Sequence, residues 1–185
     1  MPTRPHKNGH KLPCDQPSDD NGTAPTPKRI LIVDDDPSVR QMLGRILIHE
    51  GYVVGEAADG AHALEIVAAI PFDLMLLDLN MPVKNGWETF ERLTSQKPWL
   101  PVIIITARPN QLFMSAGAGA GALLEKPLDF PKLLETIRLL LVEDPAEQIA
   151  RNAGRLAAFY YHPVRPKSQY HEKTHSHRKM EGKQL

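Results

Sequence analysis

The chain has 185 residues, of which 42% are hydrophobic and 24% charged, a balance typical of a globular protein with one ordinary domain and some extra length. Its 22 basic and 22 acidic residues cancel, so the overall charge indicates neither nucleic acid nor membrane lipid as a partner. A single cysteine, Cys14, excludes an internal disulfide, and no window approaches the roughly 20 apolar residues of a membrane span. The basic start lacks the apolar core of a signal peptide, so we expect a cytoplasmic protein without a membrane partner.

Residues 1–27 are predicted to be disordered. They contain six prolines and scarcely any apolar residues. Such a segment cannot bury enough surface to offset the entropy lost on ordering. Ordered structure is expected from Lys28.

Strands and helices are then expected to alternate. The branched apolar run at 29–33 indicates a strand buried on both faces. Asp36 and Pro37 supply an N-cap and a first-turn proline for a helix, and Gly51 suits its end. Further strands are expected at 52–57, 73–77, 101–105 and 122–125, and further helices at 61–70, 87–97, after Pro109 and at 129–142. This order predicts an α/β fold with a doubly wound, five-stranded parallel sheet.

Polar residues follow the strands at the edge where such sheets carry their reactive groups. The first strand is followed by Asp34, Asp35 and Asp36, the third by Asp78 and Asn80, the fourth by Thr106 and Ala107, and the fifth by Lys126. Clustered carboxylates repel one another, and oxygen ligands of this kind suit Mg²⁺. A carboxylate that attacks a phosphoryl group needs such a cation, and a lysine and a hydroxyl add further stabilisation. Each residue alone has an ordinary reading, such as a helix cap for Asp36, but the set points to phosphoryl transfer.

Four segments carry a resemblance to a known family. "ILIVDDDPSVRQML", "FDLMLLDLNMPVKNGWE", "PVIIITA" and "LLEKPLDFPKLL" resemble the successive signatures of the receiver domains of two-component response regulators, over residues 28–143. The resemblance implies a flavodoxin-like sheet with strand order 2-1-3-4-5. It also implies that Asp78 is the phosphorylated residue, with Thr106 and Lys126 binding the phosphoryl group. The implied Mg²⁺ site consists of Asp35 directly, Asp34 through water, Asp78, and the backbone carbonyl of Asn80.

Other positions match the family or depart from it. Pro127 matches a proline that follows a cis peptide bond, and Gly86 matches a loop glycine for which positive φ or an ordinary turn are both open readings. Leu123 stands where the family commonly has an aromatic switch residue, so output must rely on other shifts of the surface. The Gly/Ala-rich stretch 115–122 predicts a short or poorly formed fourth helix. Arg108 occupies a position that in this family tunes the access of water to the acyl phosphate.

The end of the chain is expected to add one helix and a tail. Asp144-Pro145-Ala146-Glu147 reads as a capping box and predicts an additional helix over 144–161, which either packs on its own domain or binds a partner or second copy. Residues 162–185 are predicted to be disordered. After Pro145 eight Lys and Arg residues face three Glu, so salt-sensitive contacts with nucleic acid are one reading, and the three histidines of the tail are read as solvated. The tail lacks the length of a helix-turn-helix module, so we expect no sequence-specific DNA binding.

The favoured function is a single-domain response regulator. It accepts a phosphoryl group from a sensor histidine kinase or a histidine phosphotransfer protein and signals through contacts with another protein, with a homodimer as a further option. It is not expected to be an enzyme beyond transfer to itself and autodephosphorylation. A dehalogenase-type phosphatase is disfavoured because Asn80, rather than an aspartate, stands two residues after Asp78. A phosphate-independent scaffold and a regulator whose basic tail contacts nucleic acid remain alternatives.

Overall fold

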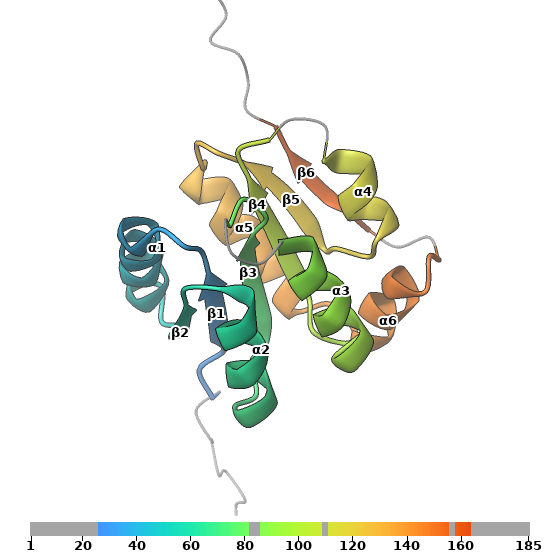
Figure 1. Cartoon of the computed structure of the whole chain (residues 1–185), viewed down its shortest axis with the longest axis horizontal. Helices are drawn as coiled ribbons and strands as arrows, with labels where there is room; N and C mark the ends of the chain where they lie inside the picture. The colour runs from blue at the N-terminus through green and yellow to red at the C-terminus, as the bar shows by residue number, and fades with distance from the viewer. Residues whose placement is uncertain (1–25, 82–85, 109–110, 156–157, 164–185) are drawn as a thin grey trace, which may run out of the picture.

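The structure is a computed structural model that describes residues 26–81, 86–108, 111–155 and 158–163 (Figure 1). The predictions of disorder for 1–27 and 162–185 lie almost entirely outside these residues, as do the three tail histidines. Among the described residues no helix has the length and apolar character that crossing a bilayer requires.

The core of the fold is one parallel sheet with the strand order β2-β1-β3-β4-β5-β6. The predicted order of the first five strands is confirmed, and the sixth strand was not predicted. The strands are β1 (Arg29–Val33), β2 (Val53–Ala57), β3 (Leu74–Asp78), β4 (Val102–Thr106), β5 (Ala122–Glu125) and β6 (Tyr160–His162). All residues of β3 and β4 are buried, which explains why their sequences are continuous apolar runs rather than alternating ones.

Helices cover both faces of this sheet. They are α1 (Pro37–His49), α2 (Gly60–Ala69), α3 (Gly86–Gln96), α4 (Leu112–Gly117), α5 (Phe130–Leu141) and α6 (Pro145–Asn152). One apolar cluster packs α2 and α3 against one face, and a second packs α1 and α5 against the other. The doubly wound arrangement brings the carboxyl ends of all the strands to one edge.

Helices α1 and α6 each begin after an aspartate that caps their first turn. The side chain of Asp36 accepts the N–H of Ser38 at 2.8 Å, and Asp144 accepts the N–H of Ala146 at the same distance. Each aspartate is followed by a proline at the first helical position. Gly51 follows α1 with φ of 87°, the left-handed conformation that suits the end of a helix. The predicted starts of these helices are therefore confirmed.

Helices α4 and α6 are both short. The fourth helix, α4, has only six residues, as the glycine content predicted. The prediction of a helix as far as Tyr161 is wrong: α6 ends at Asn152, and 160–162 form a strand. The backbone of Gly154 adopts φ of 72°, which stops the helix, and the chain returns to pair with the open edge of β5.

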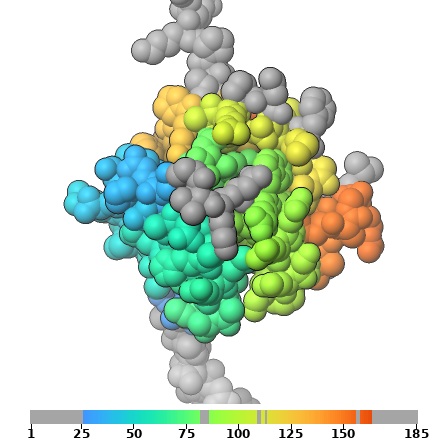
Figure 2. All heavy atoms as spheres, in the orientation of Figure 1, coloured from blue at the N-terminus to red at the C-terminus, as the bar shows by residue number. Residues whose placement is uncertain are grey.

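The α6 helix packs on its own domain, as the first of the two readings had it. Figure 2 shows it against α3, where a shallow groove separates them. Gln148 is buried and donates to the carbonyl of Gly119 at 3.2 Å, while Asn152 donates to the carbonyl of Pro98. Gly119 has φ of 91°, and a Cβ there would lie 2.3 Å from Oδ1 of Asn152. The domain boundary predicted at 143/144 stays a prediction.

Candidate functional site

Three carboxylates meet at the carboxyl edge of the sheet. Asp34 and Asp35 follow β1, and Asp78 is the last residue of β3. One carboxylate oxygen from each lies within 4.8 Å of the others. Asp34 and Asp78 are 2% and 3% exposed, whereas Asp35 faces solvent. The structure thus brings together three of the residues that the sequence singled out.

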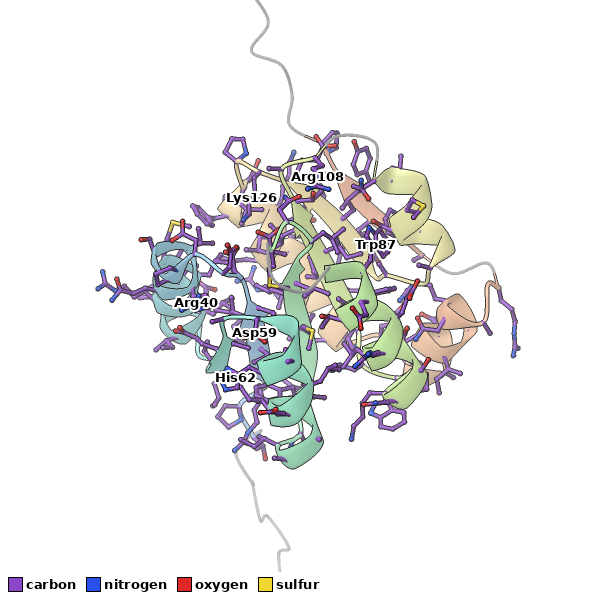
Figure 3. The ribbon with its side chains drawn as sticks, viewed as in Figure 1. Arg40, Asp59, His62, Trp87, Arg108 and Lys126 are labelled. Carbon is purple, nitrogen blue, oxygen red and sulfur yellow. The ribbon has the colours of Figure 1, made fainter. Side chains whose placement is uncertain are left out.

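Lys126, directly after β5, joins the two buried carboxylates. Its Nζ atom donates to Oδ2 of Asp78 at 2.7 Å and to Oδ2 of Asp34 at 2.9 Å. Burial lowers the pKa of Lys126, but hydrogen bonds to Asp78 and Asp34 outweigh that effect and raise the pKa above its ordinary value. Lys126 is therefore a cation that bridges two strand ends. Figure 3 shows it and Arg108 at this edge.

The second oxygen of each buried carboxylate binds backbone. Oδ1 of Asp34 accepts the N–H of Asp36 at 2.9 Å, and Oδ1 of Asp78 accepts the N–H of Asn80 at 2.8 Å. Each aspartate thus bonds to the amide two residues on, as in an Asx-turn. Burial raises the pKa of Asp34 and outweighs the hydrogen bonds from Lys126 and Asp36, which lower it. The two side chains are held in matching poses, each between the lysine and its own turn.

Thr106, the last residue of β4, is fully buried beside this cluster. Its Oγ1 accepts hydrogen bonds from Nδ2 of Asn80 at 3.3 Å and from the N–H of Arg108 at 3.0 Å. Oδ1 of Asn80 is buried and has no hydrogen-bond partner among the described residues. Asn80 therefore links the loop that carries Asp78 to the hydroxyl at the end of β4.

Gly86 lies where two segments of backbone pack closely together. It opens α3 without positive φ, so of the two open readings the one that required positive φ is wrong. A Cβ at this position would lie 2.6 Å from the carbonyl oxygen of Asp78 and 2.6 Å from Cα of Leu79. The start of α3 therefore approaches the backbone of the candidate acceptor too closely for any side chain.

The remaining matches fall near β5. The Lys126–Pro127 peptide bond is cis, as expected. Leu123 is buried, and its neighbour across the sheet is Tyr161 of β6. The Tyr161 hydroxyl donates to Oε1 of Glu125 at 2.7 Å, which raises the pKa of Tyr161. This aromatic residue beside β5 was not predicted, because the sequence pattern around Tyr161 indicated a helix.

Comparison with known proteins agrees with this geometry. Residues 30–138 match the model of the response regulator receiver domain. The chain belongs to this receiver family. The receiver is 41% identical over 128 residues to the response regulator MprA of Mycobacterium avium, covering 66% of this chain and 56% of that protein. It is 37% identical over 119 residues to the transcriptional regulatory protein TcrA of Mycobacterium tuberculosis, covering 63% and 47%. The receiver thus spans about half the length of these relatives.

Solved structures show the same fold. A CheY-like receiver domain protein of Methanospirillum hungatei is 34% identical, with a TM-score of 0.60, and the match covers 66% of this chain and 97% of that one. The response regulator TrrA of Thermotoga maritima is 32% identical, with a TM-score of 0.58 and coverage of 61% and 98%. That structure of TrrA is a complex with Mg²⁺ and BeF. The acidic triad of this receiver is of the kind that forms the Mg²⁺ site of receivers.

Proposed function

We propose that Asp78 accepts a phosphoryl group in a Mg²⁺-dependent reaction, with a sensor histidine kinase or a histidine phosphotransfer protein as the donor. The observation that carries this proposal is the bridge from Lys126 to Asp34 and Asp78 inside a cluster of three carboxylates. The arrangement leaves a carboxylate at a strand end with a fixed cation beside it. A carboxylate so placed is a nucleophile for phosphoryl transfer.

The residues fit Mg²⁺ by their chemistry. Three carboxylates carry more negative charge than one lysine neutralises, and their ligand atoms are all oxygens. Mg²⁺ prefers one or two carboxylates together with waters and phosphate oxygens. Asp34, Asp35 and Asp78 would hold the ion, with the backbone carbonyl of Asn80 as a fourth ligand. Bound there, Mg²⁺ would neutralise the oxygens of the transferring phosphoryl group.

Each residue of the site has its own role in the proposed transfer. A carboxylate oxygen of Asp78 forms a bond to phosphorus while the P–N bond of the donor phosphohistidine breaks. The electron pair of that bond stays on the imidazole, which takes a proton from solvent. Lys126 is placed to bind a phosphoryl oxygen, since its Nζ already contacts Asp78. The Thr106 hydroxyl is placed to donate to a second oxygen after turning from its present contacts.

We propose that the phosphorylated form signals through contacts with another protein, in the reducing cytoplasm that a lone cysteine fits. The surface that binds the partner would exist in two conformations. Phosphorylation shifts the equilibrium between them only as far as the phosphoryl oxygens interact more favourably with one conformation than with the other. Because the phosphoryl group stays on the chain, we regard the protein as a stoichiometric acceptor rather than an enzyme. We take Arg108 to modulate the lifetime of the acyl phosphate.

The test is intact-mass detection of one added phosphoryl group after incubation with acetyl phosphate, with Mg²⁺ or with EDTA. The native chain should gain the group only with Mg²⁺, and Asp78→Asn should gain none. Asp73→Asn is the matched control, because Asp73 lies at the opposite end of β3 and pairs with Lys28. A folded native chain that binds Mg²⁺ and takes up no phosphoryl group would favour the phosphate-independent scaffold.

A further inference from the structure

A second cation serves the acidic loop without touching its carboxylates. Arg40 lies on α1 beside β2 (Figure 3). Its Nη1 donates to the backbone carbonyl of Asp34 at 2.7 Å and to that of Asp35 at 3.1 Å. Only 15% of its side chain is exposed. One guanidinium thus binds consecutive carbonyls of the segment that supplies two of the three clustered carboxylates.

The position of Arg40 is costly for a helix taken alone. It is the fourth residue of α1, at the end of the helix whose dipole favours negative charge. A solvated arginine would turn away from this end, whereas Arg40 is held inward. Glu56 of β2 supports it, with Oε2 lying 3.6 Å from Nε of Arg40. The side chain is therefore anchored from two sides, by β2 and by the loop after β1.

The two cations of the site differ in what they occupy. Lys126 uses Oδ2 of both Asp34 and Asp78. Arg40 binds carbonyl oxygens, so it adds positive charge to the acidic loop and competes with no metal for a carboxylate oxygen. Fixing two successive carbonyls also fixes the peptide planes from which the carboxylates of Asp34 and Asp35 project. An arginine suits these contacts better than a lysine because its Nη1 and Nε atoms lie in one rigid plane, so Nη1 can bind the two carbonyls while Nε faces Glu56.

We propose that Arg40 is a positioning residue of the Mg²⁺ site: it sets the directions of Asp34 and Asp35 and thereby the affinity for the ion. The inference rests on the proposed function, since it assumes that the acidic triad holds Mg²⁺. Groups that orient metal ligands without touching the metal typically contribute about 10- to 100-fold to metal affinity. Arg40 likewise does not touch the metal position. It acts through the backbone carbonyls of two ligand residues.

The test is isothermal titration of the full chain with MgCl₂, with no phosphoryl donor present. Arg40→Gln should weaken Mg²⁺ binding about 10-fold, the lower end of that range, because Arg40 contacts the backbone and not the carboxylates of the ligand residues. Arg40→Lys should also weaken it, because the charge remains but the rigid guanidinium plane that serves both the two carbonyls and Glu56 is lost. Arg45→Gln is the matched control, since Arg45 lies on the exposed side of the same helix. Circular dichroism should show that every variant is folded at the titration temperature.

A second readout separates positioning from general support of the fold. With acetyl phosphate, Arg40→Gln should need more Mg²⁺ for half-maximal phosphorylation, yet reach the native rate at saturating Mg²⁺. Native affinity in folded Arg40→Gln would overturn the inference, and so would full rescue by Arg40→Lys. A native chain that binds no Mg²⁺ would instead refute the proposed function, and this inference with it.

Discussion

Nζ of Lys126 lies 2.7 Å from Oδ2 of Asp78, although the strands that carry them are separated by β4. The same atom bonds to Asp34 at the end of β1. One ammonium group therefore ties together the ends of three strands. It also keeps the carboxylate of Asp78, the candidate acceptor, in contact with the ammonium group that would bind the phosphoryl oxygens.

This contact predicts an alkaline limit on stability. The pKa of Lys126 is raised above its ordinary 10.5 in the folded chain, so the folded state holds the proton more tightly than the unfolded state. The stabilisation is fully present below 10.5 and is lost as the pH rises through the raised pKa. In EDTA, the difference in free energy of unfolding between the native chain and Lys126→Met should be constant near neutral pH and shrink above 10.5. Urea titrations at a series of pH values measure it, and a difference that stays flat or grows there would contradict the assignment.

Mg²⁺ should stabilise the fold through the acidic triad. At about 100 times its Kd, an ion that binds only the folded state adds about 2.7 kcal/mol to the free energy of unfolding. Asp35→Asn should remove most of this gain while changing the metal-free protein little, because Asp35 is exposed. Asp36→Asn is the control, since asparagine also caps a helix and Asp36 is outside the triad. Thermal unfolding with and without Mg²⁺ measures this gain. An equal loss of the gain in both variants would contradict the assignment of the ion to the triad.

Gly86 should tolerate no side chain. The Cβ of alanine there would meet backbone atoms of Asp78 and Leu79 at 2.6 Å, and relief requires moving α3 or the end of β3. We expect Gly86→Ala to cost about 1–3 kcal/mol, as overpacking does. Gly117→Ala meets nothing within 4 Å and should stabilise α4 by about 0.5–1 kcal/mol. Urea unfolding of the two variants tests the contrast, and two effects of the same sign would count against the close approach.

Much of the fold could be predicted because its signals are local. Strands buried on both faces are apolar runs, and Asp36, Asp129 and Asp144 cap helices through their own side chains. The polar residues of the site could be found because they stand where those runs end. Their convergence then follows from the parallel sheet.

The parts that were missed depend on distant partners. A strand as short as 160–162 carries no period of its own and forms only because the edge of β5 is open. Gly86 looks the same in the sequence whether it serves positive φ or a close approach. One signal in the sequence could have pointed to Arg40: it is a cation near the start of a helix, where the helix dipole disfavours positive charge. Its partners, the carbonyls of Asp34 and Asp35, have no signature in the sequence.

The last prediction concerns the ion pair that holds α6. Arg151 and Glu143 are buried, with 3% and 8% of their side chains exposed, and they bond to each other through both guanidinium amino groups. Nε of Arg151 also donates to the carbonyl of Ala158, just before β6, at 2.7 Å. Arg151→Met leaves the Glu143 carboxylate buried without its cation and should cost about 3–5 kcal/mol.

The control is Arg92→Met, which breaks the exposed pair with Glu88 and should cost less than about 1 kcal/mol. Adding Glu143→Leu to Arg151→Met should recover part of the loss, because the unpaired charge is then gone. Hydrogen exchange should also quicken at the Tyr160 amide, which bonds to the carbonyl of Gly121. If Arg151→Met costs no more than Arg92→Met and the Tyr160 amide stays protected, then α6 and β6 are held by their apolar and backbone contacts instead.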